Sequence, residues 1–374
     1  MRFLLAHFPA KTYQVGMKKY DIILLFSGGL DSILSAKLLE EQGLRVKCLH
    51  FTSPFFGHPG RVSHWRDTYD LDISAIDIGR EFVDMLARRP NHGFGKVLNP
   101  CVDCKILLAS RARECMPRYG AQCIASGEVL GQRPMSQRRD TLNVIKRDAE
   151  LPDLLLRPLS AQLLDPTRAE LSGLVDRSRL LAINGRGRHD QLALAEKYGL
   201  KEIPTPAGGC RLTEKENARH YWNILRFAPH PAPEDFILAD TGRRYWRTQG
   251  EEHCLLCIGR QRFDNEALMR NKQPEDLSFK IVDFPGPLAV GRQWQPWSEE
   301  AVREAAAYTA SFSPRAVRAG GSVAVSIRSG ENEYVIQVVP ERNEAWSTGT
   351  WEDAREEIRA EQKIRLHGAK PEQA

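Results

Sequence analysis

The sequence lacks several features that would place it in a specialised class of proteins. No stretch approaches the ~20 consecutive apolar residues of a membrane-spanning helix, and the apolar run in Met1–His7 is too short for a secretory leader. Eight cysteines in 374 residues are too few for a disulfide scaffold. The chain also has no internal repeat and no low-complexity block. We therefore expect a cytoplasmic protein that is not bound to a membrane.

The composition is otherwise that of a globular protein. Hydrophobic residues make up 42% of the chain and charged residues 27%, which argues against a disordered chain. At roughly 150 residues per domain, the length predicts two or three domains, each able to bury a core. The 53 Lys+Arg and 48 Asp+Glu leave a formal net charge of +5, which permits nucleic-acid binding without indicating it.

Residues 20–51 have the pattern of a βαβ unit. The apolar run Tyr20–Phe26 predicts a strand buried on both faces, and a Ser-Gly-Gly turn and an amphipathic helix follow it. Val46–Phe51 is then the second parallel strand. Because such patterns continue to alternate downstream, we predict an α/β fold with a doubly wound parallel sheet. Further strands are expected at Leu71–Ile76 and Ala121–Ala125, and helices at Cys104–Met116 and His189–Tyr198.

The pattern changes after residue 225. Prolines in Phe227–Glu234 predict a linker, and beyond it the strand and helix patterns are those of a second, smaller α+β domain. Its expected strands are Phe279–Val282, Ser322–Ile327 and Tyr334–Val339, and its expected helix is Glu299–Tyr308. The predicted order is an N-terminal extension (1–19), an α/β domain (20–225), a linker (226–234), an α+β domain (235–350) and a charged helix with a tail (351–374).

A glycine-rich turn, Ser27-Gly28-Gly29-Leu30-Asp31-Ser32, joins the first predicted strand to its helix. Two glycines let the backbone approach an anion closely, and the following helix N-terminus offers N–H groups and a positive dipole end. The lysine of a GxxxxGK[ST] loop is missing, and so is the GxGxxG spacing of a dinucleotide site. The turn therefore predicts a phosphate-binding loop of another type.

SGGLDS resembles the signature loop of the PP-loop ATP pyrophosphatases, Rossmann-like proteins of the HUP type that adenylate a carbonyl oxygen and release pyrophosphate. The resemblance implies that the loop holds the pyrophosphate part of ATP and that the catalytic aspartate, Asp31, is associated with Mg²⁺. Adenine is then expected beside the end of the second strand, near His50 and Phe51. By position, the ATP-binding roles of the loop fall on Ser27, Gly28, Gly29, Asp31 and Ser32.

Three cysteines are spaced as a joint site. Cys101 and Cys104 open a predicted helix in NPCVDCK, and Cys210 follows a glycine pair far downstream. A CxxC pair alone fits a redox pair, half of a zinc site or two unrelated thiols. A four-thiolate zinc site needs a fourth ligand, and the CLLC segment Cys254–Cys257 lies past the linker. Three thiolates with an open position suit an iron–sulfur cluster whose unique iron binds an exogenous ligand.

The cysteine segments and several others resemble the tRNA thiolation branch of the PP-loop family. NPCVDCK and PAGGCRLT are similar to its paired cysteine segments. Gly127–Gln137 is similar to the GxxLGQxxSQ segment of tRNA 4-thiouridine synthetases, although three residues, not two, separate its GQ from its SQ. Leu156–Leu159 and Gly185–Arg188 also resemble pieces of that branch. The resembling segments keep their order along the chain, and they add Gly127 to the expected ATP-binding residues.

The resemblance implies one of two sulfur chemistries. Some relatives hold a [4Fe–4S] cluster on three cysteines, and the set Cys101, Cys104 and Cys210 matches this type better. Others carry sulfur as a persulfide on a catalytic cysteine, which a second cysteine resolves as a disulfide, and Cys104 and Cys210 would then be the working pair. The expected cofactors are therefore ATP, Mg²⁺ and a [4Fe–4S] cluster.

The basic surplus lies in residues 1–225, which contain 33 Lys+Arg against 25 Asp+Glu, whereas residues 226–374 contain 20 against 23. Basic side chains close to the resembling segments are the expected contacts with RNA phosphates. They are Arg133, Arg138, Arg139, Lys146, Arg147, Arg186 and Arg188.

The C-terminal part resembles the RNA-binding domain of NFACT proteins. Residues 258–268, 275–280 and 285–286, followed by a helix from residue 299, keep the order of that family's motifs. Ser278 and Lys280 stand where the family commonly has an aromatic residue and a histidine. Arg260 and Arg262 are the expected tRNA contacts here, and the alternative is a structural or dimerisation module.

Together the resemblances imply an ATP-dependent tRNA sulfurtransferase that adenylates a uridine carbonyl, replaces its oxygen with sulfur and releases AMP and pyrophosphate. The expected partners are tRNA and either sulfide or a sulfur carrier such as a cysteine desulfurase, and a homodimer is left open. One alternative is a PP-loop sulfurtransferase or amidating ligase that acts on a small molecule. The other is a non-catalytic RNA-binding or ribosome-associated protein.

Overall fold

The computed structural model describes residues 19–204 and 209–368, which fold into two compact units. The N-terminal extension up to residue 18, Pro206–Gly208 of the third cysteine segment and the tail from residue 369 lie outside the described residues. Unit 1 consists of the described residues within Met1–Phe51, His58–Ile76 and Lys105–Ala207. Unit 2 consists of those within Thr52–Gly57, Asp77–Cys104 and Gly208–Ala374.

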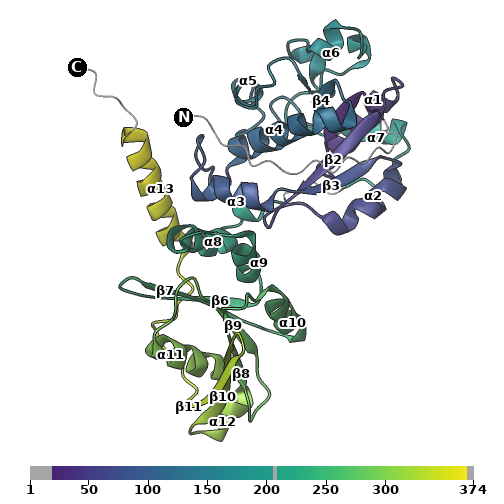
Figure 1. The fold of residues 1–374 in the computed structure, drawn as a ribbon. Helices are drawn as coiled ribbons and strands as arrows, with labels where there is room; N and C mark the ends of the chain where they lie inside the picture. The colour runs from purple at the N-terminus through teal and green to yellow at the C-terminus, as the bar shows by residue number, and fades with distance from the viewer. Residues whose placement is uncertain (1–18, 205–208, 369–374) are drawn as a thin grey trace, which may run out of the picture. The chain divides into compact units, whose positions relative to one another are not determined.

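Unit 1 is built on a five-stranded sheet in the order β3-β2-β1-β4-β5. Figure 1 labels β2, β3 and β4 of this sheet. β1 pairs in parallel with β2 and β4, and β4 pairs in parallel with β5. The strands are β1 (Ile22–Leu25), β2 (Val46–Thr52), β3 (Ile73–Asp77), β4 (Cys123–Ser126) and β5 (Leu155–Leu156). The direction of winding reverses between β1 and β4, which is where such sheets form a ligand crevice. The predicted doubly wound parallel sheet is confirmed.

The apolar residues of β1 explain why helices cover this sheet. Ile22, Ile23 and Leu24 are fully buried, as expected of a central parallel strand. α1 buries eight of its eleven residues, so it is a core helix rather than a surface one. The helices that begin or lie in unit 1 are α1 (Leu30–Glu40), α2 (Val62–Tyr69), α5 (Arg139–Asp148), α6 (Arg168–Leu171) and α7 (His189–Lys197), with short η1 (Pro59–Arg61), η2 (Ala161–Leu163) and η3 (Arg177–Arg179). α4 (Cys101–Tyr119) has its first four residues in unit 2 and the rest in unit 1.

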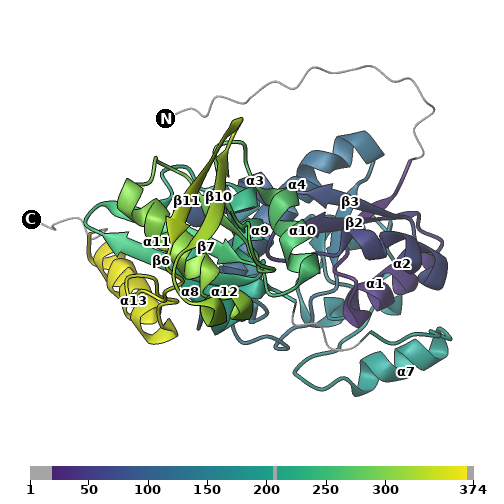
Figure 2. The same ribbon diagram turned by 90° about the horizontal axis from the view of Figure 1, so that it is seen from below.

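Unit 2 contains an antiparallel sheet of six strands in the order β11-β10-β8-β9-β7-β6, which confirms the predicted second domain. Figure 2 shows the β10–β11 hairpin at its edge. The strands are β6 (Arg243–Gln249), β7 (Glu252–Ile258), β8 (Leu277–Ile281), β9 (Leu288–Arg292), β10 (Val323–Ser329) and β11 (Asn332–Val338). The helices are α3 (Gly79–Ala87), α8 (Lys215–Phe227), α9 (Pro233–Ala239), α10 (Arg262–Asn271), α11 (Glu299–Ala310), α12 (Pro314–Ala319) and α13 (Trp351–Gly368), with η4 (Arg211–Thr213).

The charged C-terminal helix α13 packs on α8 within unit 2. The Glu357 carboxylate accepts a hydrogen bond from Trp222 Nε1 at 2.9 Å and pairs with Arg226 at 2.5 Å. The proline-rich segment 226–234 joins α8 to α9 inside the same unit. The domain boundaries drawn from the sequence remain a prediction. No helix among residues 19–204 and 209–368 is both long and apolar enough to cross a bilayer.

Candidate active site

The glycine-rich loop leaves the carboxyl end of β1 and enters α1 with little room for side chains. Gly28 has a φ of +79°, and a Cβ there would lie 2.4 Å from the indole ring of Trp65. Only glycine fits a position that is both left-handed and covered by a ring. Gly29 is the residue before α1, and its carbonyl accepts a hydrogen bond from Ser32 Oγ at 2.7 Å. The loop is therefore held open at the positive end of a buried helix, where an anion binds well.

Asp31 lies in the first turn of α1, with one carboxylate oxygen held and the other left for a ligand. Gln132 Nε2 donates to Asp31 Oδ2 at 3.1 Å. Asp31 Oδ1 is buried and accepts no hydrogen bond within the described part of the chain. A buried, unpartnered carboxylate oxygen beside a phosphate loop is the type of ligand that Mg²⁺ takes. The residues present therefore fit the expected magnesium ion.

Gly127, just after β4, lies against the start of α1. A Cβ at Gly127 would lie 2.6 Å from the Ser32 nitrogen and 2.7 Å from the Asp31 carbonyl carbon. Both are backbone atoms and cannot rotate away. The sequence placed Gly127 among the ATP-binding residues, and the structure brings it against the residues of the loop.

A buried cluster of charges stands next to Gly127. Arg157 Nε donates to Glu128 Oε2 at 3.1 Å, Ser126 Oγ donates to the same oxygen at 3.1 Å, and Lys105 Nζ lies 3.6 Å from Glu128 Oε1. Burial raises the pKa of Glu128, but the charges of Lys105 and Arg157 outweigh it and hold the pKa below its usual value. The cluster anchors the segment that follows β4 to the core of unit 1.

His50, expected near adenine, is buried in β2 with both ring nitrogens engaged. Its Nδ1 lies 2.9 Å from the Phe26 carbonyl oxygen, and His58 N donates to its Nε2 at 2.9 Å. Nδ1 therefore carries the proton and Nε2 accepts. Phe51 is buried beside it. Whether these residues contact adenine stays a prediction, but the ring of His50 already ties the end of β1 to the segment before α2.

We expect His50 to remain neutral in mildly acidic solution, with its proton on Nδ1. Burial is the largest cause that lowers its pKa, so the neutral form persists as the pH falls through the ordinary histidine range near about 6.5. Nitrogen-15 correlation spectra of histidine-labelled protein test this, with a His50→Asn variant to identify the resonances. A doubly protonated His50 ring at about pH 6 would contradict the assignment.

Trp65 of α2 is a site residue that the sequence analysis missed. Its ring packs edge-on against His50, with 4.9 Å between ring centroids, and against Phe26 at 5.6 Å. It also covers Gly28, as described above. Nothing in the local pattern of α2 marks this tryptophan, because its role depends on the loop that it meets.

The structure brings two of the predicted RNA-binding segments together. Gly185 N donates to the Leu130 carbonyl oxygen at 2.8 Å, and residue 130 forms a parallel bridge with Asn184. The turn that holds Asp31 through Gln132 thus adjoins the GRGR segment. The predicted RNA-contact side chains are exposed or half-buried here: Arg133, Arg138, Arg139 and Arg186 are exposed, and Arg188 is half-buried.

Arg260 and Arg262, the predicted RNA contacts of the C-terminal domain, lie at the start of α10 in unit 2. Both are exposed. Arg262 pairs with Glu266 one helical turn later at 2.9 Å. Such an exposed pair stabilises the helix by only a few tenths of a kcal/mol. Arg262 could therefore exchange Glu266 for a phosphate group at little cost in free energy.

The three predicted sulfur cysteines all belong to unit 2, whereas the glycine-rich loop belongs to unit 1. Leu98 N donates to the Leu212 carbonyl oxygen at 3.1 Å, which joins the two cysteine segments. Asn99 Nδ2 donates to Cys101 Sγ at 3.0 Å. Burial raises the pKa of Cys210 to about 11, and the neighbouring Cys101 adds to the rise. The two cysteine segments are therefore neighbours within unit 2, and Asn99 is a polar contact that the sequence analysis did not single out.

Cys104 lies one turn into α4 and is half-buried. None of the eight cysteines, all of which the structure describes, forms a disulfide. Among residues 19–204 and 209–368, no group of three or more His, Cys, Asp or Glu side chains is arranged to hold a metal ion. The three cysteines are thus not drawn together as a ligand set.

A comparison with protein families decides what the loop belongs to. Residues 18–162 match the model of the family ThiI, described as thiamine biosynthesis protein. Over this stretch, which is less than half of the chain, the sequence is similar to the ThiI family. The matched stretch contains the glycine-rich loop, Gly127, Glu128 and Arg157, and it ends before the GRGR segment and Cys210.

Proteins named tRNA sulfurtransferase match a stretch of similar length. That of Edwardsiella ictaluri (strain 93-146) is 32% identical over 157 residues, or 40% of this chain and 30% of the relative. That of Serratia proteamaculans (strain 568) is 30% identical over 155 residues, or 39% and 30%. The match thus spans less than a third of the length of these relatives. Among solved structures, the C-terminal part of the fibronectin/fibrinogen-binding protein from Streptococcus suis is similar at 17% identity over 48% of this chain and 84% of that chain, with a TM-score of 0.24, too low to support an argument.

Proposed function

We propose that the protein is an ATP-dependent tRNA sulfurtransferase that makes thiouridine. The observation that carries this proposal is the buried, unpartnered Asp31 Oδ1 in a glycine cradle that admits no side chain. This cradle lies in the stretch that matches the ThiI family model, and the relatives named tRNA sulfurtransferase support the choice of substrate.

The first half-reaction is adenylation in unit 1. ATP would bind with its pyrophosphate part against Gly28, Gly29 and the N-terminus of α1, where backbone N–H groups and the helix dipole stabilise negative charge. A uridine carbonyl oxygen attacks the α-phosphorus, the bond to the β-phosphate oxygen breaks, and pyrophosphate leaves. Mg²⁺ on Asp31 Oδ1 would neutralise charge on the leaving pyrophosphate. Gln132 keeps Asp31 oriented by occupying its other oxygen.

The second half-reaction is sulfur transfer by the cysteines of unit 2. A persulfide anion on one cysteine attacks the adenylated carbon, and AMP leaves with the original oxygen. A second thiolate then attacks the first cysteine's sulfur, which leaves a thiocarbonyl on the base and a disulfide in the protein. A persulfide donor such as a cysteine desulfurase must supply the sulfur, and a thiol reductant must restore both cysteines. The hydrogen bond that joins the segments of Cys101 and Cys210 supports this pair, and the pair Cys104 and Cys210 stays a prediction.

A [4Fe–4S] cluster would require Cys104 to join Cys101 and Cys210 as a third ligand. The described residues do not show such a grouping, so no step of the proposed reaction passes through a cluster. The expectation remains testable by an anaerobic iron and sulfide assay on the parent protein and a Cys101→Ala variant. A brown protein with about four irons per chain, lost in the variant, would establish the cluster. A colourless, fully active protein would exclude it.

The remaining expectations belong to the same proposal. The C-terminal NFACT-R-like domain (235–350) would position tRNA through Arg260 and Arg262, and the reaction would take place in the cytoplasm. A homodimer is compatible with this scheme. A persulfide-bearing carrier would be the second partner of this route, whereas free sulfide, the other expected donor, would suit only the cluster route.

The proposal is tested by incubating purified protein with ATP, unmodified tRNA and a sulfur donor. We expect tRNA-dependent formation of AMP and pyrophosphate, and thiouridine in the nucleosides released from the tRNA. An Asp31→Asn variant should form neither. AMP formation without tRNA would favour the small-molecule alternative, and a failure to consume ATP under any condition would favour the non-catalytic one. Unchanged thionucleosides in a deletion strain would reject tRNA as the substrate.

A further inference from the structure

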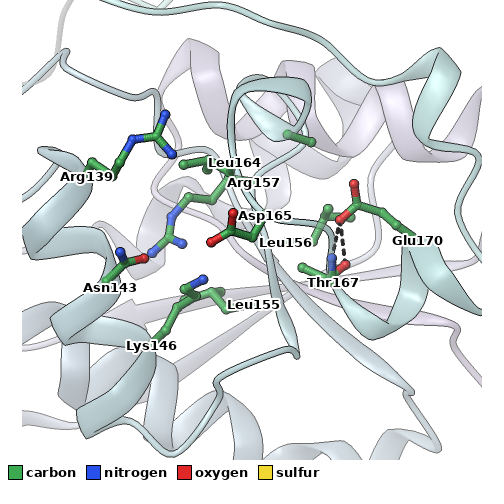
Figure 3. Close-up of a pocket in the computed structure, with 11 residues that line it drawn as sticks. Arg139, Asn143, Lys146, Leu155, Leu156, Arg157, Leu164, Asp165, Thr167 and Glu170 are labelled. Carbon is green, nitrogen blue, oxygen red and sulfur yellow. Dashed lines mark hydrogen bonds between the residues drawn. The ribbon is translucent and has the colours of Figure 1, made fainter.

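A pocket in unit 1 lies between α5, β5 and the turn that leads into α6 (Figure 3). Arg139, Asn143 and Lys146 line one wall, and their spacing of four and three residues puts them on one face of α5. Figure 3 shows the polar ends of these three side chains turned toward the pocket, with Asp165 opposite and Arg157 between them. We call this feature the α5 pocket.

Two of the charged groups in the α5 pocket are already neutralised by the protein. The Arg157 guanidinium is buried and bonded to Glu128. The Glu170 carboxylate pairs with Arg177 through one oxygen and accepts from Thr167 N at 2.7 Å through the other. Arg157 and Glu170 therefore line the pocket without needing a charged ligand, because each already has a partner of opposite charge.

The other basic groups of the pocket form no ion pair within the described part of the chain. Arg139 donates to the Leu163 carbonyl oxygen at 2.8 Å and forms no ion pair with another described residue. Lys146 Nζ makes neither an ion pair nor a hydrogen bond in the described part of the chain, although its side chain is half-buried. Burial is the largest cause that lowers the pKa of Lys146, and the charge of Arg157 is the next. With Asp165 as the one opposing free carboxylate of the lining, the pocket keeps one positive charge in excess.

The interior of the α5 pocket, about 10 Å³, has room for no more than a water molecule. We propose that a phosphodiester group of the RNA backbone binds over the α5 pocket, at the exposed side chains of Arg139 and Asn143 and the half-buried Lys146. The wall from α5 offers a guanidinium, an amide and an ammonium, all of which can donate to phosphate oxygens. The carboxylate of Asp165 opposes a second negative charge, so the site suits the monoanion of a phosphodiester better than the dianion of free phosphate. This inference rests on the proposed function, because it takes the RNA substrate as the source of the phosphodiester.

The place of the pocket in unit 1 supports the RNA backbone as its occupant. α5 directly follows the turn whose Gln132 holds Asp31, and that turn adjoins the GRGR segment. Arg157 on the pocket floor is bonded to Glu128, next to Gly127, which abuts the phosphate loop. A phosphodiester bound here would therefore hold RNA on elements that are continuous with those of the adenylation site.

The test is tRNA binding by full-length variants as a function of salt. Lys146→Gln, combined with Arg139→Gln, should weaken tRNA binding by about 10- to 100-fold, and each lost phosphate contact should reduce the salt slope by about one. Lys146→Arg should keep most of the affinity. Lys197→Gln is the control for the loss of one positive charge, because it removes a lysine from an exposed pair with Glu41 in the same unit. Asp165→Asn should tighten binding.

The outcomes separate this inference from the proposed function. If the parent binds tRNA and the pocket variants match Lys197→Gln in affinity and salt slope, the pocket assignment is wrong while the function stands. If the parent binds no tRNA, both fail. If millimolar inorganic phosphate alone displaces tRNA from the parent but not from the double variant, the pocket is a site for free anions, and the phosphodiester assignment is overturned. Thermal unfolding of each variant shows whether a loss of binding reflects a loss of fold.

Discussion

Gly127→Ala is expected to lower tRNA-dependent AMP formation by about 100-fold or more. The added methyl group would lie 2.6 Å from the Ser32 nitrogen and 2.8 Å from the Asp31 carbonyl oxygen. Neither backbone atom can move without shifting the first turn of α1, and with it Asp31 and the phosphate loop. A misplacement of about 1 Å in a catalytic group is enough to cost about 10²-fold in rate. The rate of AMP release at saturating ATP is the measurement.

Gly60→Ala is the matched control for this substitution. Gly60 also lies in unit 1, but a Cβ there would meet no heavy atom within 4 Å, so the rate should stay within about twofold of the parent. Urea unfolding of both variants separates a shifted loop from a lost fold. A folded Gly127→Ala protein with parental activity would show that ATP is not bound at the SGGLDS loop.

Glu128→Gln is expected to reduce the free energy of unfolding by about 3–5 kcal/mol. Its carboxylate is 4% exposed and faces Arg157 at 1% exposure, so the substitution would leave a buried guanidinium without its counter-charge. Removal of one partner leaves an uncompensated buried charge, which destabilises the fold strongly, whereas replacement of both partners by apolar residues often changes stability little. Denaturant unfolding at neutral pH measures the difference.

An exposed pair in the same unit provides the control. Glu150 pairs with Arg113 and is 74% exposed, so Glu150→Gln should change the free energy of unfolding by less than about 1 kcal/mol. Because the folded-state pKa of Glu128 is lowered, its stabilisation is complete above the ordinary carboxyl pKa and is lost as the pH falls through the lowered value. The difference between parent and Glu128→Gln should therefore shrink in acid. Equal stability of the two proteins at neutral pH would show that the pair is not buried.

The first strand and the glycine-rich loop could be predicted from the sequence because the residues that determine them are neighbours in the chain. The run Tyr20–Phe26 is apolar throughout, as a strand covered on both faces requires, and β1 lies inside it. Two adjacent glycines before a helical pattern predict a loop that approaches an anion, and Gly28 has the positive φ that this needs. The alternation of strands and helices was also enough to predict a parallel sheet.

The tertiary surroundings of the cysteines could not be predicted from local sequence patterns. Their spacing suggested that Cys101, Cys104 and Cys210 act together, and the structure does join the two segments through Leu98 and Leu212. It also assigns all three cysteines to unit 2, whereas the glycine-rich loop belongs to unit 1. The sequence had predicted a domain boundary at residue 225, which would place the cysteines and the loop in one domain. No periodicity in residues 77–104 reveals that this stretch packs with the C-terminal half of the chain.

What the sequence by itself determined is the identity of the loop, its strand and its helix, because turn chemistry and hydrophobic periodicity act over neighbouring residues. Only the tertiary structure decided that Gly127 abuts Asp31, that Trp65 covers Gly28 and that both nitrogens of His50 are occupied. The α5 pocket also arises in this way, since Glu128 pairs with Arg157 and Glu170 pairs with Arg177, so neither carboxylate forms an ion pair with Lys146. Such contacts join residues that are distant in the chain, and they depend on the packing of whole side chains, which local patterns do not encode.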